Sequence, residues 1–135
     1  MVKKRLLWLL VWVLLAPAVQ ARTDSSAGVI EKAYRQHRSN LQVTGEGTVI
    51  KLLPDDNQGD RHQRFILRLP SGFTVLVAHN IDLATKVAGL KFGDRIEFAG
   101  EYEWSEKGGT VHWTHRDPAR RHADGWLRFG GKVYQ

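Results

Sequence analysis

Turn signals recur at short intervals along this chain and divide it into segments too short for long helices. Glycine, proline, asparagine and aspartate gather at residues 54–60, 70–72, 93–94 and 107–109. Between these turns apolar and polar residues alternate, most clearly over residues 65–69 and 95–104. Alternation with a period of two is typical of half-buried strands. The chain after residue 42 is therefore expected to be mainly β.

Five strands and one short helix are expected in this region. The strands are placed at residues 45–53, 65–69, 73–78, 95–104 and 110–114. Between the third and fourth strands, Asp82 can cap a short helix and Gly89 can end it. This is the element order of an OB-fold, a five-stranded Greek-key barrel. An immunoglobulin-like sandwich would need about seven strands and no internal helix.

A helix is also expected ahead of the barrel, and a short hairpin after it. Apolar side chains recur at helical spacing over residues 29–41, which predicts an amphipathic helix there. Residues 125–135 carry aromatic side chains around two glycines and predict a last hairpin packed on the domain. The predicted division is a signal peptide at 1–21, an extension with its helix at 22–42, and an OB-fold-like domain at 43–135.

The first 21 residues have the features of a secretory signal. Three basic residues at 3–5 precede an apolar run over 6–15, and small residues follow at 16–21. Extended to Val19, the apolar run is 14 residues long and contains Pro17, so it is shorter than the roughly 20 residues that span a bilayer. We expect cleavage after Ala21, export to the periplasm or the extracellular space, and no stable membrane span afterwards.

Removal of this signal changes the charge of the chain. The net charge falls from +6 to +3, because three of the 20 basic residues are lost while all 14 acidic residues remain. A smaller charge and an export signal argue against nucleic acid as the partner. The chain has no cysteine, so its core must stabilise it without disulfides. The sequence does not indicate an oligomeric state.

Histidine is concentrated near the C-terminal end, where residues 112–126 hold three of the six histidines. His115, Asp117 and His122 form a candidate metal-binding set, because a turn at Asp117-Pro118 can bring the two histidines together. His112 and His115 are three residues apart, so on a regular strand they point to opposite faces. The spacing matches no recognised metal signature. No cofactor is firmly implied, and a divalent metal ion is the candidate.

A larger set of polar residues is expected at strand ends and turns. The candidate ligand-binding residues are Asp55, Asp56, Arg61, His62, Arg64, His79, Asn80, His115 and Asp117. In an OB-fold the loop between the first two strands borders the ligand face, and aspartates beside arginines could hold a cation or clamp a phosphate. The alternative is a polar turn that caps its own backbone, with His79 as a buried, hydrogen-bonded histidine. The sequence leaves both alternatives open.

Two further packing predictions follow from the alternation. Trp113 is in phase with Val111, so its indole is expected to fill the barrel interior against the apolar face of the fourth strand. The polar face of that strand carries Glu97, Glu101 and Glu103. These glutamates are expected to pair with arginines across the sheet.

Several segments resemble the bacterial domain-of-unknown-function family 3465. The similar segments are residues 53–57, 61–65, 78–83, 100–104, 111–115 and 125–127. The resemblance extends over residues 45–135, which is most of the chain after the signal. The resemblance implies a small exported protein and supports the domain boundaries. It supplies no activity and no catalytic residue.

Two functions are compatible with these residues. In the first, a binding module presents His62, His79, His115 and arginines around one pocket to a small polar or anionic ligand. In the second, a metal-dependent hydrolase of the phosphodiesterase or nuclease type uses His112 or His115 with Asp117 to hold its ion. The chain contains no complete catalytic signature, which favours the binding module without deciding whether the protein is an enzyme.

Overall fold

The structure of the protein is a computed structural model that describes residues 26–135. The predicted signal peptide and its cleavage site after Ala21 lie outside the described residues. The elements are α1 (Ser26–Arg35), β1 (Leu41–Asp56), β2 (His62–Arg68), β3 (Thr74–Asn80), β4 (Arg95–Glu103), β5 (Thr110–His112), β6 (Trp126–Phe129) and β7 (Lys132–Tyr134). Within residues 26–135, no helix combines the length and the apolar character needed to cross a membrane.

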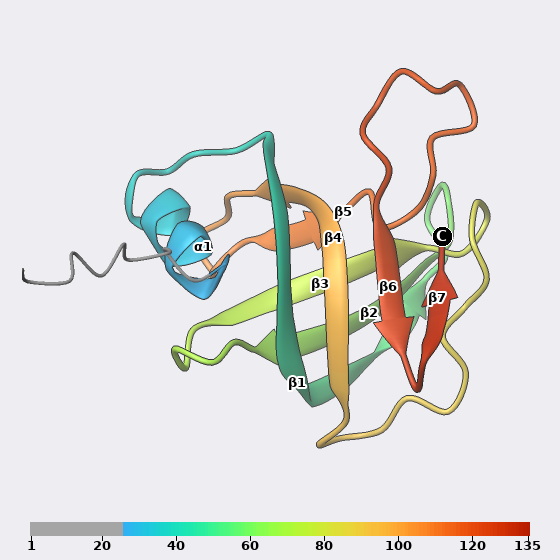
Figure 1. The fold of residues 1–135 in the computed structure, drawn as a ribbon, viewed down its shortest axis with the longest axis horizontal. Coiled ribbons are helices and arrows are strands. Elements are labelled where there is room, and N and C mark those ends of the chain that lie inside the picture. Colours follow the sequence, from blue (N-terminus) through green and yellow to red (C-terminus); the bar gives the residue numbers. More distant parts are fainter. Residues whose placement is uncertain (1–25) are drawn as a thin grey trace, which may run out of the picture.

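Five of the strands form a ring, which confirms the mainly β class (Figure 1). The pairs β1–β2, β2–β3, β4–β5 and β1–β4 are antiparallel, and β3–β5 is parallel. In the view of Figure 1, β2 and β3 cross behind β1 and β4, and α1 lies at one end of the ring. The predicted last hairpin is confirmed as β6–β7, and β6 pairs with β4.

The long strand β1 closes this ring because it serves two neighbours. Its first half pairs with β4 and its second half pairs with β2, and Thr48 belongs to both ladders, opposite Arg68 and Arg95. Gly47 lies next to this point, where a Cβ would stand only 3.0 Å from the carbonyl oxygen of Arg68. Glycine therefore lets β1 pass close to β2 where it changes partners.

The core fills the inside of the ring. Phe65, Phe98 and Tyr102 are fully buried there, and Ile30 of α1 joins them. The Tyr102 hydroxyl donates a hydrogen bond to the carbonyl oxygen of Gly108 at 2.8 Å. Burial raises the pKa of Tyr102 to about 12, so the hydroxyl keeps its proton and this bond persists at neutral pH. The core thus includes a polar link to the β4–β5 turn.

The predicted N-terminal helix has different bounds in the structure. The prediction was residues 29–41, whereas α1 ends at Arg35. His37 and Asn40 adopt positive φ angles of 52° and 58°, which a continuing right-handed helix does not allow. Leu41 then begins β1 instead of ending the helix.

The short helix predicted over residues 82–89 is wrong: the chain there forms turns. Only one helix-like backbone bond forms, from Ala84 N–H to the Asn80 carbonyl at 3.1 Å. The expected cap, Asp82, is instead bound to Arg61 at 2.7 Å. The backbone of Val87 bonds to the Gln63 side chain rather than to a neighbouring turn. Side chains from β2 and β3 have replaced the hydrogen bonds of the helix.

The core position predicted for Trp113 is also wrong. β5 ends at His112, and Trp113 takes a positive φ of 54°, so the alternation with Val111 is lost. The indole is only partly buried. It stacks on the His122 ring with centroids 3.9 Å apart and planes 10° apart.

Substitutions of two aromatic residues test this assignment of the core. Phe65→Ala should lower the free energy of unfolding by about 3–5 kcal/mol, because Phe65 is fully buried. Trp113→Ala should cost only about 1 kcal/mol, since it loses one stacked ring at the surface. Urea unfolding of both variants and the wild type measures the difference. Equal losses in the two variants would contradict the placement of Trp113 outside the core.

Candidate functional site

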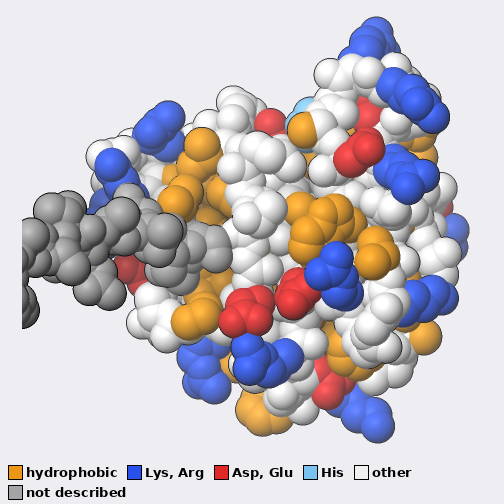
Figure 2. Space-filling view, viewed as in Figure 1, with side chains coloured by type: hydrophobic (Ala, Val, Ile, Leu, Met, Phe, Trp, Pro, Cys, Tyr) orange, Lys and Arg blue, Asp and Glu red, His pale blue; other side chains and the backbone are white. Residues whose placement is uncertain are grey.

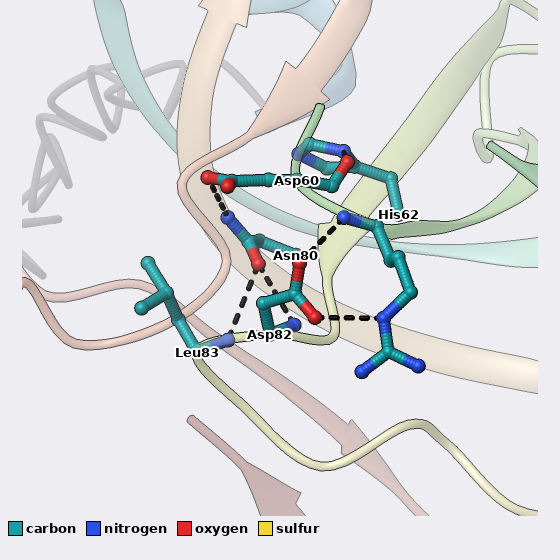
Figure 3. Close-up of polar contacts among 6 residues, drawn as sticks. Asp60, His62, Asn80, Asp82 and Leu83 are labelled. Carbon is teal, nitrogen blue, oxygen red and sulfur yellow. Dashed lines mark hydrogen bonds and ion pairs between the residues drawn. The ribbon is translucent and has the colours of Figure 1, made fainter. Parts of the chain in front are cut away.

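Asn80, at the end of β3, links two loops (Figure 3). Its side-chain amide donates to the Asp60 carboxylate at 3.1 Å, and its side-chain oxygen accepts the N–H groups of Asp82 and Leu83 at 2.9 and 3.2 Å. Arg61 contributes its backbone N–H and its Nε to the Asp82 carboxylate at 2.8 and 2.7 Å. The backbone hydrogen bond from Arg61, followed by the one from its side chain, lowers the pKa of Asp82. The network joins the β1–β2 loop to the loop after β3.

The other candidates on the β1–β2 side also have partners inside the protein. The carboxylate of Asp55 binds Lys86 at 2.6 Å, and that of Asp56 accepts the N–H of Gln58 at 3.0 Å. His62 Nδ1 lies 2.9 Å from the Asp60 carbonyl oxygen. Arg64 donates Nε and Nη2 to the Pro54 carbonyl at 3.2 and 3.0 Å. These contacts match the alternative of a self-capping polar turn.

Gln63 has a structural role that the sequence analysis missed. It is buried, and its amide makes two hydrogen bonds with the backbone of Val87, at 3.0 and 2.9 Å. Its side chain thus makes the pair of backbone hydrogen bonds that a neighbouring strand would make, and it holds the loop after β3 in place. The sequence did contain a signal for this role. Gln63 falls on the same face of the alternating strand as the buried residues Phe65 and Leu67. A polar residue on an apolar face requires a hydrogen-bond partner.

His79 is the buried, hydrogen-bonded histidine of the second alternative. It is fully buried, with Nε2 3.0 Å from the Thr85 carbonyl oxygen and Nδ1 2.7 Å from the Thr114 hydroxyl. A carbonyl only accepts, so Nε2 carries the proton and Nδ1 accepts from Thr114. Burial lowers the pKa of His79, partly opposed by the Thr85 hydrogen bond, and the charges of His115 and His62 lower it further. His79 is therefore a neutral link between β3 and two loops.

The predicted metal set of His115, Asp117 and His122 is not assembled around one point. Among the described residues, those three do not form a group of metal-ligating atoms. Asp117 accepts the N–H groups of Ala119, Arg121 and His122 at 2.9, 2.9 and 3.0 Å, and these bonds, that of Arg121 first, lower its pKa. His115 is buried, with Nδ1 2.7 Å from the carbonyl oxygen of Arg116. Asp117 organises the loop and fixes the backbone of His122.

The structure brings a different set together, which we call the Glu–His cluster: Glu101, Glu103, His112 and His122. His112 Nε2 lies 3.3 Å from Glu101 and 3.4 Å from Glu103, and His122 Nε2 lies 3.5 Å from the other oxygen of Glu101. The glutamates share one face of β4, and His112 stands opposite Glu101 on β5. Among residues 26–135, neither of these two glutamates has the predicted arginine partner, because β4 pairs with β1, β5 and β6 rather than β2.

The sequence contained part of the signal for this cluster. Alternation had placed both glutamates on one polar face, and the turn at residues 107–109 pairs that face with the strand carrying His112. The contribution of His122 could not be found in this way. Its position depends on the course of the loop after β5. That course is determined by the hydrogen bond from the His122 N–H to Asp117 and by the left-handed backbone conformation of Trp113.

Of several surface hollows of about 350–580 Å³, two contain residues of the predicted ligand-binding set, Arg64 in one and Asp117 in the other. A groove of about 350 Å³ lies on the outer face of β2 and β3, and we call it the outer groove. A second hollow of about 580 Å³ lies in the loop between β5 and β6. That loop projects from the ring in Figure 1, and Figure 2 shows Lys and Arg side chains gathered on the projection. In this loop Asp117 and Asp124 stand beside the arginines and offset their charge.

Comparison with known protein families matches residues 11–135 to proteins of unknown function that share the DUF3465 domain. The chain belongs to the DUF3465 family. This confirms the resemblance drawn from the sequence, and the match covers all seven strands and α1. A search of curated proteins gives no match. Roles for residues of this DUF3465 protein therefore rest on its own geometry.

The buried His79 should make stability depend on pH. Its folded pKa lies below the ordinary 6.5, so the unfolded state binds a proton first as the pH falls. The contribution of His79 is complete above 6.5 and is lost as the pH falls towards the folded pKa. Urea unfolding between neutral and mildly acidic pH should show falling stability, with a flatter dependence in His79→Gln. His37→Gln, at an exposed histidine, is the control, and equal slopes in wild type and His79→Gln would refute the assignment.

Proposed function

We propose that this DUF3465 protein is an exported binding module with an OB-fold-like ring, and that the outer groove holds a small anionic ligand. The strand order supports the OB-fold assignment. The ring runs β1-β2-β3-β5-β4 and returns to β1, with one parallel pair between β3 and β5. Turns replace the helix between β3 and β4, which is a departure from the expected pattern. The charged, apolar and small-residue pattern of residues 1–21 in the sequence supports export.

The location of the groove supports a ligand-binding role. OB-folds bind ligands on the face of the second and third strands, bordered by the loops after the first and fourth strands. The outer groove lies over β2 and β3, between Leu53 of β1 and Ser105 and Lys107 of the β4–β5 turn. Its volume of about 350 Å³ falls at the lower end of ordinary ligand pockets, which fits a small ligand.

The lining of the groove carries the proposal. Ile66 and Leu76 form an apolar floor, while Arg64 and Lys107 supply two positive charges. Among residues 26–135, neither cation has an ion-pair partner: Arg64 is held by the carbonyl of Pro54, which orients the guanidinium without neutralising it. A fixed guanidinium favours bidentate contact with a carboxylate or phosphate. An apolar floor with unneutralised cations fits an anionic ligand that has an apolar body.

The chemistry of the lining favours binding over hydrolysis. The described residues that line the outer groove include neither a carboxylate nor a histidine. These are the side chains that most often move protons in catalysis near neutral pH. The hydroxyl groups of Thr74, Ser105 and Thr110 offer hydrogen bonds that can orient a ligand.

A ligand screen with three variants tests this function. Thermal shift with phosphates, nucleotides, sugars and aromatic carboxylates should stabilise the wild type with at least one anionic compound. Arg64→Met and Lys107→Met should each weaken that compound about tenfold or more, since each removes a charge-assisted contact worth roughly 1.5–3 kcal/mol. Arg68→Met is the matched control, because Arg68 lies on the same face of β2 but outside the groove. No response to any anion, or equal losses in all three variants, would contradict the proposal.

A further inference from the structure

We propose that Glu101, Glu103 and His112 bind a divalent transition-metal ion of the zinc type. These residues lie on β4 and β5, and none of them lines the outer groove, so the inference does not depend on the proposed function. They also differ from the predicted metal set of His115, Asp117 and His122, of which only His122 comes near. Of the ion ligands named for the hydrolase alternative, the site contains only His112. The ligand atoms of the three residues lie within 4.8 Å of one another.

The separations of these atoms match those of ligands that share one ion, and His112 also lies within hydrogen-bonding distance of Glu103. His112 Nε2 is 3.3 Å from Glu101 Oε2 and 3.4 Å from Glu103 Oε1. Hydrogen bonds from N–H to oxygen are usually about 2.9–3.0 Å long. In a tetrahedral zinc site, with ligands about 2.0–2.1 Å from the ion, neighbouring ligand atoms are roughly 3.3–3.4 Å apart. Both distances correspond to edges of such a tetrahedron.

The backbone holds these ligands in place before any ion arrives. Glu101 and Glu103 are two residues apart on a strand, so their carboxylates share one face and repel each other. Register sets His112 directly opposite Glu101. The close approach of β5 depends on Gly100, where a Cβ would collide with the carbonyl oxygen of His112. The site is therefore built on paired strands rather than on mobile side chains alone.

His122 lies beside Glu101 at the edge of the site. Its Nε2 is 3.5 Å from the second oxygen of the Glu101 carboxylate. Its Nδ1 lies 2.8 Å from the carbonyl oxygen of Ala123. Stacking on Trp113 keeps the His122 ring in this position.

The donor set and its exposure indicate the class of ion. One imidazole nitrogen with two carboxylates suits zinc, cobalt, nickel or copper, whereas calcium and magnesium prefer ligand sets made of oxygen alone. The side chains of His112 and Glu101 are 33% and 16% exposed, so the site is open to an ion without being fully hydrated. Three protein ligands leave a further position for water, which is typical of open zinc sites.

Cobalt and zinc titrations of the purified, untagged and chelator-treated chain test the site. The wild type should bind one Co²⁺ with the strong visible absorption of a four-coordinate ion, and Zn²⁺ should displace it. His112→Gln and Glu103→Gln should each weaken Zn²⁺ binding by more than about tenfold, measured by calorimetry. Two controls should keep wild-type affinity: Glu97→Gln, which removes an exposed glutamate of β4 paired with Arg128, and His37→Gln, which removes an exposed histidine stacked on Trp104.

Two results would overturn the inference. The first is a wild type that binds neither Co²⁺ nor Zn²⁺ saturably at neutral pH, which would leave the cluster as histidine–glutamate ion pairs only. The second is binding that persists within about twofold in both ligand variants, which would place the ion elsewhere. Thermal unfolding of each variant shows whether it is folded, and the wild-type titration decides the question even where a variant is not.

Discussion

The change of partner along β1 is the constraint on which the rest of the structure depends. One strand of 16 residues pairs with β4 through its first half and with β2 through its second. The ring closes because Thr48 belongs to both ladders, and Gly47 permits the close passage at that point. Closure leaves neither β1 nor β4 as a free edge in the ring. It also sets the outer faces on which the outer groove and the Glu–His cluster are built.

The loops around this ring are held by buried polar side chains rather than by apolar packing. Three buried polar residues at or near the ends of β2 and β3 bind the backbone of the segment after β3. They are Gln63, His79 and Asn80. Buried polar groups require hydrogen-bond partners. These contacts provide partners for the three side chains and at the same time hold the loop in place. This explains why residues that resemble a ligand site in the sequence serve as connections. The polar groups of the outer groove and of the Glu–His cluster lie instead on the outer faces of the ring.

Much of the architecture could be predicted from local sequence, whereas the sites could not. Alternation and turn residues predicted the positions of β2, β3 and β4 and the last hairpin, because strand periodicity and turn chemistry are local properties. The helix predicted over residues 82–89 does not form, because its expected capping residue, Asp82, binds the sequence-distant Arg61 instead. The core position predicted for Trp113 is wrong because Trp113 itself adopts a left-handed backbone conformation, which ends the alternation of the strand. No local signal in the sequence marks that change. The Glu–His cluster needs the register of β4 against β5 and the course of a loop, which only the folded chain determines.

Native-state amide hydrogen exchange, followed by NMR, tests most directly whether the closed ring is one cooperative unit. If β1 closes it, the amides of β1 that face β4 and those that face β2 should exchange only through global unfolding, with protection equal to the free energy of unfolding. Val77 and Val111, in the parallel pair of β3 and β5, should show the same protection. The account would be contradicted if the β1–β4 ladder exchanged at much lower free energy than the β2–β3 ladder. The ring would then open at β1 as a separate unit.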